Sequence, residues 1–221
     1  MSDQAYDTAV FDVDGTLVDS NYHHVLAWYR AFRRFGLTIP CWRIHRATGQ
    51  GGDQIVGYLA GDDVERQHGD DLRDAYAEEF SPVRDEIQPF GPAQDLLQRV
   101  KERGLEVVLA SSGKEDDVEH FVDILGVRGI ATLWTSSKDA EQSKPAPDIV
   151  EVAVGRAGAA KPVMVGDSVW DVKAAQQLGI PTVCVRNGGF GVDELREAGA
   201  VEVWESLDEL LDGLDRSILG G

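Results

Sequence analysis

The stretch Phe11-Asp12-Val13-Asp14-Gly15-Thr16-Leu17-Val18-Asp19-Ser20 decides how the rest of this chain is interpreted. Residues 9–11 are apolar and predict the end of a buried strand. Gly15 predicts a sharp turn, because glycine bends at no steric cost. Asp12 and Asp14 therefore stand at the carboxyl end of a strand, where open α/β sheets bind ligands. Side chains alternate along a strand, so the turn must bend Asp14 back toward Asp12 if both serve one site. A plain Asp-Gly turn without function is the alternative.

The charge of the chain limits its partners. The 221 residues carry a formal net charge of −18, and the pI is about 4.5. Such a surface repels nucleic acid and anionic membranes, so we expect neither as a partner. An anionic substrate then needs a local positive site, which a metal ion, a lysine or a helix N-terminus supplies.

Cysteine usage and the N-terminus predict a cytoplasmic protein. Cys41 and Cys184 are the only cysteines and lack metal-ligand spacing, so we expect two reduced thiols. Residues 1–4 have neither the basic nor the apolar region of a signal peptide, and the chain has no apolar run of membrane length. Both monomer and homodimer stay open.

Hydrophobic periodicity divides the chain into three stretches. Residues 20–89 show helical patterns and no convincing strand, and they end at the breakers Ser81-Pro82 and Pro89-Phe90-Gly91-Pro92. From Ala93 strands and helices alternate, with strands expected at 105–110, 130–135, 163–165, 182–185 and 201–203. The alternation predicts an α/β fold with a mostly parallel sheet and helices on both faces. Residues 1–19 and 90–221 would form this core, and residues 20–89 an inserted all-helical domain.

Polar residues recur where the expected strands end. Ser111-Ser112-Gly113-Lys114 follows the second strand and predicts an anion site at a helix N-terminus. Lys144-Pro145-Ala146-Pro147-Asp148 and Gly166-Asp167-Ser168-Val169-Trp170-Asp171 follow later in the chain. Each piece alone also fits a helix cap or an exposed loop. Their joint occurrence at successive strand ends favours one functional site.

These motifs together resemble the haloacid dehalogenase superfamily, in its phosphatase and β-phosphoglucomutase-like branch. The resemblance covers essentially the whole chain and is most specific around Asp12 and around Asp167. It implies a Rossmann-like core with a helical cap inserted after the first strand. This agrees with the division inferred from periodicity.

The resemblance also implies roles in phosphoryl transfer, in which positioning and charge neutralisation dominate. Asp12 would be the nucleophile that forms an aspartyl-phosphate, and Asp14 the acid and base. Mg²⁺ would be held by Asp12, the main-chain carbonyl of Asp14 and Asp167, with Asp171 supporting that shell. The phosphoryl oxygens would be bound by two further residues, Ser111 and Lys144.

Within the superfamily, Asp14 favours the phosphate-handling members, because the dehalogenases lack an acid at that position. Phosphonate-cleaving members use a cap lysine, and residues 20–89 contain no lysine. His23 stands where β-phosphoglucomutase-like enzymes have a histidine that steadies the acid. Gly52, however, occupies the place of the mutase arginine that grips the distal phosphate. A phosphatase is therefore favoured over a mutase.

The expected substrate is a small phosphorylated metabolite, such as a sugar phosphate or phosphoglycolate. Its contacts are expected from the cap and from the Ser-Ser-Gly turn. The first candidates are His23, Thr48 and Gln50 of the cap and Ser112 of the turn. Further candidates in the cap are His24, Arg43, Arg46 and Asp53. The loop 187–191 favours a simple turn over a wall of the site. A β-phosphoglucomutase-like mutase and a catalytically inactive binding module on the same fold are the alternatives.

Overall fold

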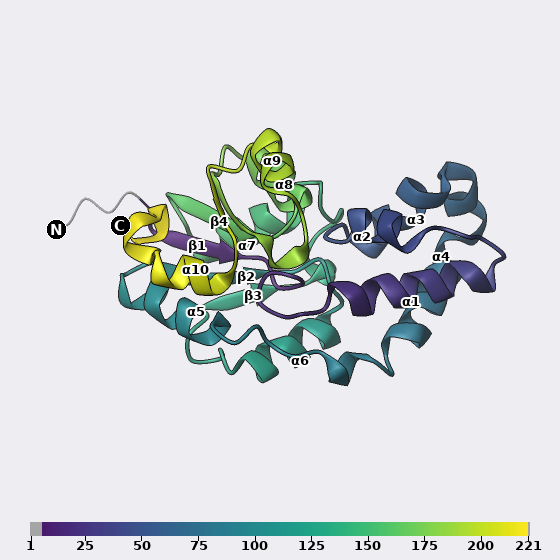
Figure 1. Cartoon of the computed structure of the whole chain (residues 1–221), viewed down its shortest axis with the longest axis horizontal. Coiled ribbons are helices and arrows are strands. Elements are labelled where there is room, and N and C mark those ends of the chain that lie inside the picture. The colour runs from purple at the N-terminus through teal and green to yellow at the C-terminus, as the bar shows by residue number, and fades with distance from the viewer. Residues whose placement is uncertain (1–5, 221) are drawn as a thin grey trace.

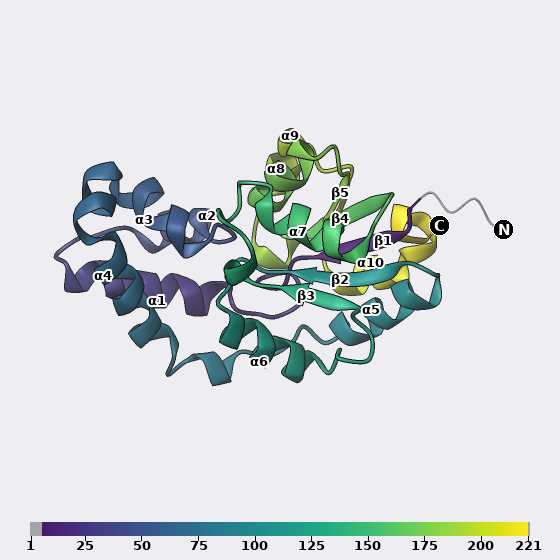
Figure 2. The same ribbon diagram turned by 180° about the vertical axis from the view of Figure 1, so that it is seen from behind.

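The computed structural model describes residues 6–220. Residues 1–4, on which the expectation of no signal peptide rests, lie outside this range. The chain forms two lobes, a sheet with its helices and a helical lobe at the carboxyl end of β1 (Figure 1). Figure 2 shows the same two lobes from behind. Among residues 6–220, no helix is both long and apolar enough to cross a membrane.

The core is a parallel sheet of six strands in the order β3-β2-β1-β4-β5-β6. The strands are β1 (Thr8–Phe11), β2 (Glu106–Ala110), β3 (Leu133–Thr135), β4 (Pro162–Gly166), β5 (Thr182–Val185) and β6 (Glu202–Trp204). The strand order reverses beside β1, which pairs with β2 on one side and β4 on the other. A doubly wound sheet binds its ligands at such a reversal, outside the carboxyl ends of its strands.

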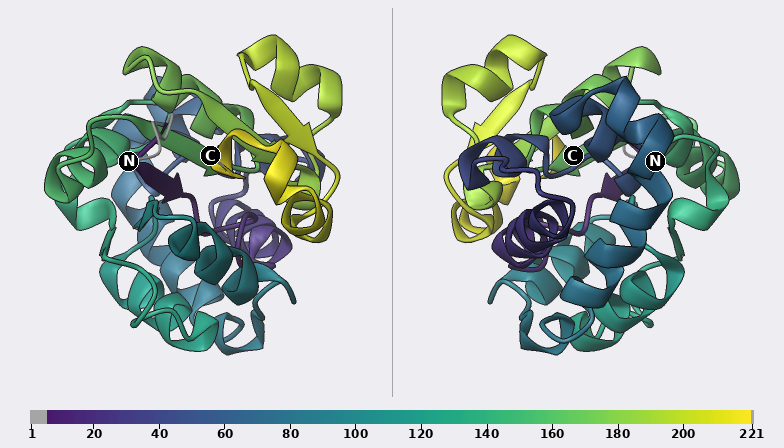
Figure 3. Two further views of the ribbon diagram at one scale, coloured as in Figure 1. Left: turned by 90° about the vertical axis from the view of Figure 1, so that its left-hand side faces the viewer. Right: turned by 90° about the vertical axis from the view of Figure 1, so that its right-hand side faces the viewer.

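Helices cover both faces of the sheet, as Figure 3 shows from its two ends. They are α5 (Ala93–Glu102), α6 (Glu115–Leu125), α7 (Asp148–Ala157), α8 (Val169–Gln177), α9 (Val192–Ala198) and α10 (Leu207–Asp212). Successive side chains of a strand point to opposite faces. Accordingly, Phe11 packs in the core formed with α5, α6 and α10, whereas Val10 packs in the core formed with α7 and α8. Because both faces are covered, the central strands are continuous apolar runs.

The inserted lobe contains α1 (Asn21–Arg34), α2 (Cys41–Ala47), α3 (Gly52–Ala60) and α4 (Asp62–Phe80). It has an apolar core of its own, in which Phe32 of α1, Ile44 of α2 and Leu72 of α4 are fully buried. We call this lobe the cap. The domain boundaries at residues 20 and 90 stay a prediction.

The fold class predicted from sequence is confirmed, and all six expected strands are present. The third strand is shorter than the expected 130–135 and begins at Leu133. Ile130 and Ala131 lie in the turn before it and are buried there, so their apolar side chains resembled part of the strand. The short helix α9 was missed. Its seven residues are too few to show a helical period.

Gly15 and Gly36 both have a left-handed backbone, but only Gly15 is crowded by neighbouring side chains. Gly15 has a φ of +77°, and a Cβ there would lie 2.4 Å from Asn21 Nδ2 and 2.7 Å from Asp167 Oδ2. Gly36 has a φ of +72°, and nothing lies within 4 Å of its Cβ position. We expect Gly36→Ala to lower the free energy of unfolding by about 1 kcal/mol. Gly15→Ala should lower it by clearly more, as measured by urea unfolding. Equal losses in the two variants would contradict this account of the first turn.

Candidate active site

The predicted residues meet at the carboxyl ends of the central strands. Asp12 follows β1, Ser111 follows β2 and Asp167 follows β4. The Asp12 amide donates to the Val165 carbonyl oxygen at 2.8 Å, so the β1–β4 pairing continues to the first aspartate. Lys144 enters from the loop before α7, and its side chain is fully buried.

Three buried carboxylates lie together at this point, and two of them, Asp12 and Asp171, contact the lysine. One oxygen each of Asp12, Asp167 and Asp171 lies within 4.8 Å of the others, and the side chains are all buried. The Lys144 ammonium is hydrogen-bonded to Asp12 Oδ1, lies 2.7 Å from Asp171 Oδ1 and donates to the Ala110 carbonyl oxygen at 3.2 Å. The second oxygen of Asp171 accepts from the Ser168 hydroxyl at 2.6 Å, which caps α8.

The cluster holds more negative charge than Lys144 neutralises. Burial raises the pKa of Asp12 to about 7, even though Lys144 pulls it down. Burial, together with the charges of Asp171 and Asp12, also raises the pKa of Asp167 well above its usual range. Burial lowers the pKa of Lys144, but the two neighbouring carboxylates outweigh this effect, and the net shift is upward. Uncompensated buried charge is costly, so a further cation fits among these oxygen ligands.

Thr16 of the first motif and Asn21 at the start of α1 orient Asp167. The Thr16 hydroxyl lies 2.9 Å from Asp167 Oδ1 and 3.1 Å from Asp12 Oδ2. The Asn21 amide donates to Asp167 Oδ2 at 3.3 Å and to the Gly188 carbonyl oxygen at 3.2 Å. A Cβ at Gly188 would overlap Asp167 Oδ2 at 1.6 Å. Neither Thr16 nor Asn21 was predicted as a site residue, because threonine and asparagine are common in turns and at helix starts.

Asp14 lies beside this cluster and accepts three hydrogen bonds. The Ser20 hydroxyl and His24 Nε2 reach its Oδ1 at 2.7 and 2.8 Å, and the Ser111 hydroxyl reaches its Oδ2 at 3.2 Å. Burial raises the pKa of Asp14, but His24 and the two hydroxyls outweigh it and hold the pKa below its usual value. The carboxylate form is therefore favoured at neutral pH in this arrangement.

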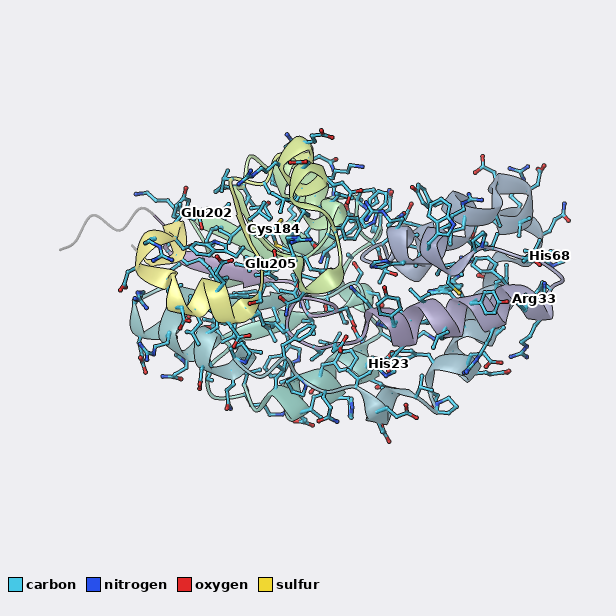
Figure 4. All side chains as sticks on the ribbon, in the orientation of Figure 1. His23, Arg33, His68, Cys184, Glu202 and Glu205 are labelled. Atoms are coloured by element: carbon cyan, nitrogen blue, oxygen red, sulfur yellow. The ribbon has the colours of Figure 1, made fainter. Side chains whose placement is uncertain are left out.

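The histidine beside Asp14 is His24 and not His23, which corrects the sequence prediction. Neighbouring residues of a helix point about 100° apart, so a shift of one position changes the residue that faces the core. The Nδ1 atom of His23 is buried without a hydrogen-bond partner in residues 6–220. Figure 4 shows His23 near the start of α1.

A cavity of about 290 Å³ lies between the cap and the core and opens onto Asp12 and Asp14. Of the cap candidates, it is lined by His24, Thr48, Gln50 and Asp53, and Ser112 lines it from the core. The amide nitrogen of Gln50 and the hydroxyl of Ser112 are buried without partners among the described residues, so each can serve a ligand. Trp28 and Tyr76 also line the cavity and were not predicted.

The other cap candidates lie away from this cavity. Arg46 pairs with Glu194 and lies 4.0 Å from the centre of the Phe190 ring, so it joins the cap to the core. Neither Arg43 nor His23 lines the cavity. The loop 187–191 is more than the expected simple turn, because the Gly188 carbonyl oxygen binds both Asn21 and His45.

Gly52 lines the cavity, and an arginine reaches it from another helix. Arg73 of α4 donates to the Gly52 carbonyl oxygen at 3.3 Å. Its guanidinium also lies 2.9 Å from both Glu65 and Asp70. Two carboxylates thus already neutralise this cation.

Residues 9–185 match the family described as haloacid dehalogenase-like hydrolase. The chain belongs to this family. It is thus an enzyme of the hydrolase class, as the sequence motifs predicted, and the acidic cluster is the family's metal-binding cluster in this chain.

Relatives of this hydrolase match it over most of their length. The phosphoglycolate phosphatase of Aquifex aeolicus is 26% identical over 186 residues, which cover 78% of this chain and 81% of the relative. The pyrophosphatase PpaX of Halalkalibacterium halodurans is 21% identical over 211 residues, which cover 93% and 95%. A crystal structure of a hydrolase from Pseudomonas syringae superposes with a TM-score of 0.88 at 29% identity, covering 95% of this chain and 98% of that one.

The raised pKa of Asp12 predicts how the stability of the metal-free hydrolase depends on pH. The folded-state pKa of about 7 lies above the unfolded value of 3.8, so the native state binds more protons between these values. This contribution to stability is complete below pH 3.8 and is lost as the pH rises through 7. In EDTA, the free energy of unfolding should fall more steeply from pH 5 to 8 in the parent than in Asp12→Asn. Asp212→Asn, a matched change at an exposed residue, should keep the parental slope. Parallel slopes for Asp12→Asn and the parent would contradict the prediction.

Proposed function

We propose that this hydrolase is a Mg²⁺-dependent phosphomonoesterase that acts on a small phosphorylated metabolite through an aspartyl-phosphate on Asp12. One observation carries the proposal: buried Asp12 contacts the ammonium of Lys144, and both Asp12 and Asp14 face the same cavity. The names of the relatives, phosphoglycolate phosphatase and pyrophosphatase, support the phosphate chemistry.

In the first step a carboxylate oxygen of Asp12 attacks the phosphorus, and the bond from phosphorus to the ester oxygen breaks. Asp14 enters this step protonated, a form that the nearby anionic phosphoryl group favours over the carboxylate of the free site, and it gives its proton to the leaving oxygen. In the second step Asp14 takes a proton from water, whose oxygen attacks the phosphorus of the aspartyl-phosphate. The bond between Asp12 and phosphorus breaks, phosphate leaves, and Asp14 is protonated for the next cycle.

Charge neutralisation makes the first step possible, because Asp12 and the phosphoryl group are both anionic. Lys144 already neutralises Asp12 from the buried side. The Ser111 hydroxyl, now 3.2 Å from Asp14 Oδ2, is placed to turn toward a phosphoryl oxygen. Mg²⁺ held by Asp12, Asp167 and the main-chain carbonyl of Asp14, with Asp171 beside it, would offset the remaining charge on the phosphoryl oxygens.

Hydrolysis is favoured over a mutase reaction by the far wall of the cavity. A mutase must hold a second phosphate while its intermediate turns over. Arg73 reaches the wall at Gly52, but Glu65 and Asp70 already neutralise it. A binding module without catalysis is disfavoured, because the set Asp12, Asp14, Lys144 and Asp167 is complete. Asp12 and Asp14 line the cavity, Lys144 contacts Asp12, and Asp167 belongs to the same carboxylate cluster as Asp12.

The test is phosphate release from a panel of sugar phosphates, phosphoglycolate and pyrophosphate, with Mg²⁺ and with EDTA. We expect Mg²⁺-dependent release and its loss by at least about three orders of magnitude in Asp12→Asn, because an amide cannot serve as the nucleophile. Asp19→Asn, a matched change at an exposed residue of the same motif, should keep most of the activity.

Turnover near the parental rate in Asp12→Asn would remove Asp12 from the nucleophile role. Release that is unaffected by EDTA would contradict the metal requirement. If the parent releases no phosphate from any compound, a mutase assay with a bisphosphorylated sugar as primer would decide between the two alternatives.

A further inference from the structure

A chain of two hydrogen bonds runs from the cap to Asp14. The Tyr76 hydroxyl lies 2.7 Å from His24 Nδ1, and the opposite ring nitrogen, Nε2, lies 2.8 Å from Asp14 Oδ1. The three groups come from different parts of the chain: α4, the first turn of α1 and the loop after β1. Both ring nitrogens of His24 are therefore engaged, and the ring cannot turn without breaking one contact.

Aromatic rings on both sides hold the His24 and Tyr76 side chains in place. The His24 ring stacks on Phe80, with centres 4.4 Å apart and planes 12° apart. The Tyr76 ring stacks on Trp28, with centres 4.3 Å apart and planes 16° apart. These residues belong to α1 and α4, which lie side by side in Figures 1 and 2. Because offset-stacked rings have preferred geometries, the Tyr76 hydroxyl has little freedom to move away from His24.

The Tyr76 hydroxyl is suited to set the tautomer of His24. Burial and the nearby charges of Asp14 and Asp117 raise the pKa of Tyr76 well above its usual value, so the phenol keeps its proton. A phenol that donates to Nδ1 leaves the ring proton of a neutral imidazole on Nε2. That proton points at Asp14 Oδ1. The other oxygen of Asp14, Oδ2, contacts Ser111 and is left for the substrate side.

We infer that Tyr76 is a positioning residue, whose hydroxyl fixes the His24 imidazole and through it the Asp14 carboxylate that exchanges a proton with the leaving oxygen. The inference rests on the proposed function, since it assigns a role within that reaction. For comparison, residues that orient metal ligands from the outer shell change affinity or activity about 10- to 100-fold when altered.

Tyr76 also lines the cavity, so it could instead contact the substrate directly. The two roles differ in what they require of the leaving group. A residue that acts through Asp14 matters when the leaving oxygen needs a proton, as in an alkyl phosphate. It matters little for p-nitrophenyl phosphate, whose leaving group departs as a stable anion.

The experiment measures kcat and KM of Tyr76→Phe with both kinds of ester in the presence of Mg²⁺. The variant keeps the stacked ring and removes only the hydroxyl. We expect kcat/KM for the alkyl phosphate to fall about 10-fold through kcat, with KM and the melting temperature nearly unchanged. The value for p-nitrophenyl phosphate should change less than about twofold. Tyr29→Phe, which removes a hydroxyl elsewhere on α1, is the matched control and should change neither value.

A double-mutant cycle separates action through His24 from an independent effect. In a His24→Asn background, Tyr76→Phe should cause no further loss, because the residue that transmits its effect is gone. Additive losses, equal losses with the two esters, or a rise in KM alone would each overturn the inference while leaving the phosphatase reaction intact. If the parent hydrolyses neither ester, the proposed function itself fails, and the inference fails with it.

Discussion

The fully buried ammonium of Lys144, held between Asp12 and Asp171, is the interaction on which the site depends. Like charges cannot be buried side by side without a counter-charge, and one ammonium does not neutralise three carboxylates. The carboxylates at the carboxyl end of β1 are therefore buried at an unfavourable electrostatic free energy. The raised pKa values of Asp12 and Asp167, both dominated by burial, are the signature of that cost. A metal ion and a phosphoryl group that bind together would convert the same charges into a binding site.

The cap supplies contacts to the site that the strand ends do not. The sheet fixes Asp12, Ser111 and Asp167 through regular strand pairing. Asp14, by contrast, accepts one hydrogen bond from Ser111 of the core but depends on the cap for its histidine, since His24 belongs to α1 and its partner Tyr76 to α4. The helical lobe thus contributes more than a wall for the substrate. It places the groups that govern Asp14, and any movement of the cap relative to the core would change them.

Much of this arrangement follows from sequence by simple rules. Buried parallel strands are continuous apolar runs, so β1, β2, β4 and β5 stand out. Polar residues directly after such runs must gather at one edge of the sheet, which explains why Asp12, Ser111 and Asp167 were correctly brought together. The cap was predictable as helical, but its side chains were not predictable as contacts. One residue of helix register separates His23 from His24, and Tyr76 reaches His24 only because α1 and α4 pack together. Periodicity alone fixes neither detail.

If Asp12 carries the phosphoryl group during turnover, the position of that group on the chain can be mapped directly. The enzyme would be mixed with a hydrolysable phosphate ester and Mg²⁺, quenched in acid within one turnover, digested and mapped by mass spectrometry. We expect a phosphoryl group on the peptide that contains Asp12, and we expect it to disappear as free phosphate forms. Steady turnover with a phosphoryl group on another residue, or on none at any time, would contradict this expectation.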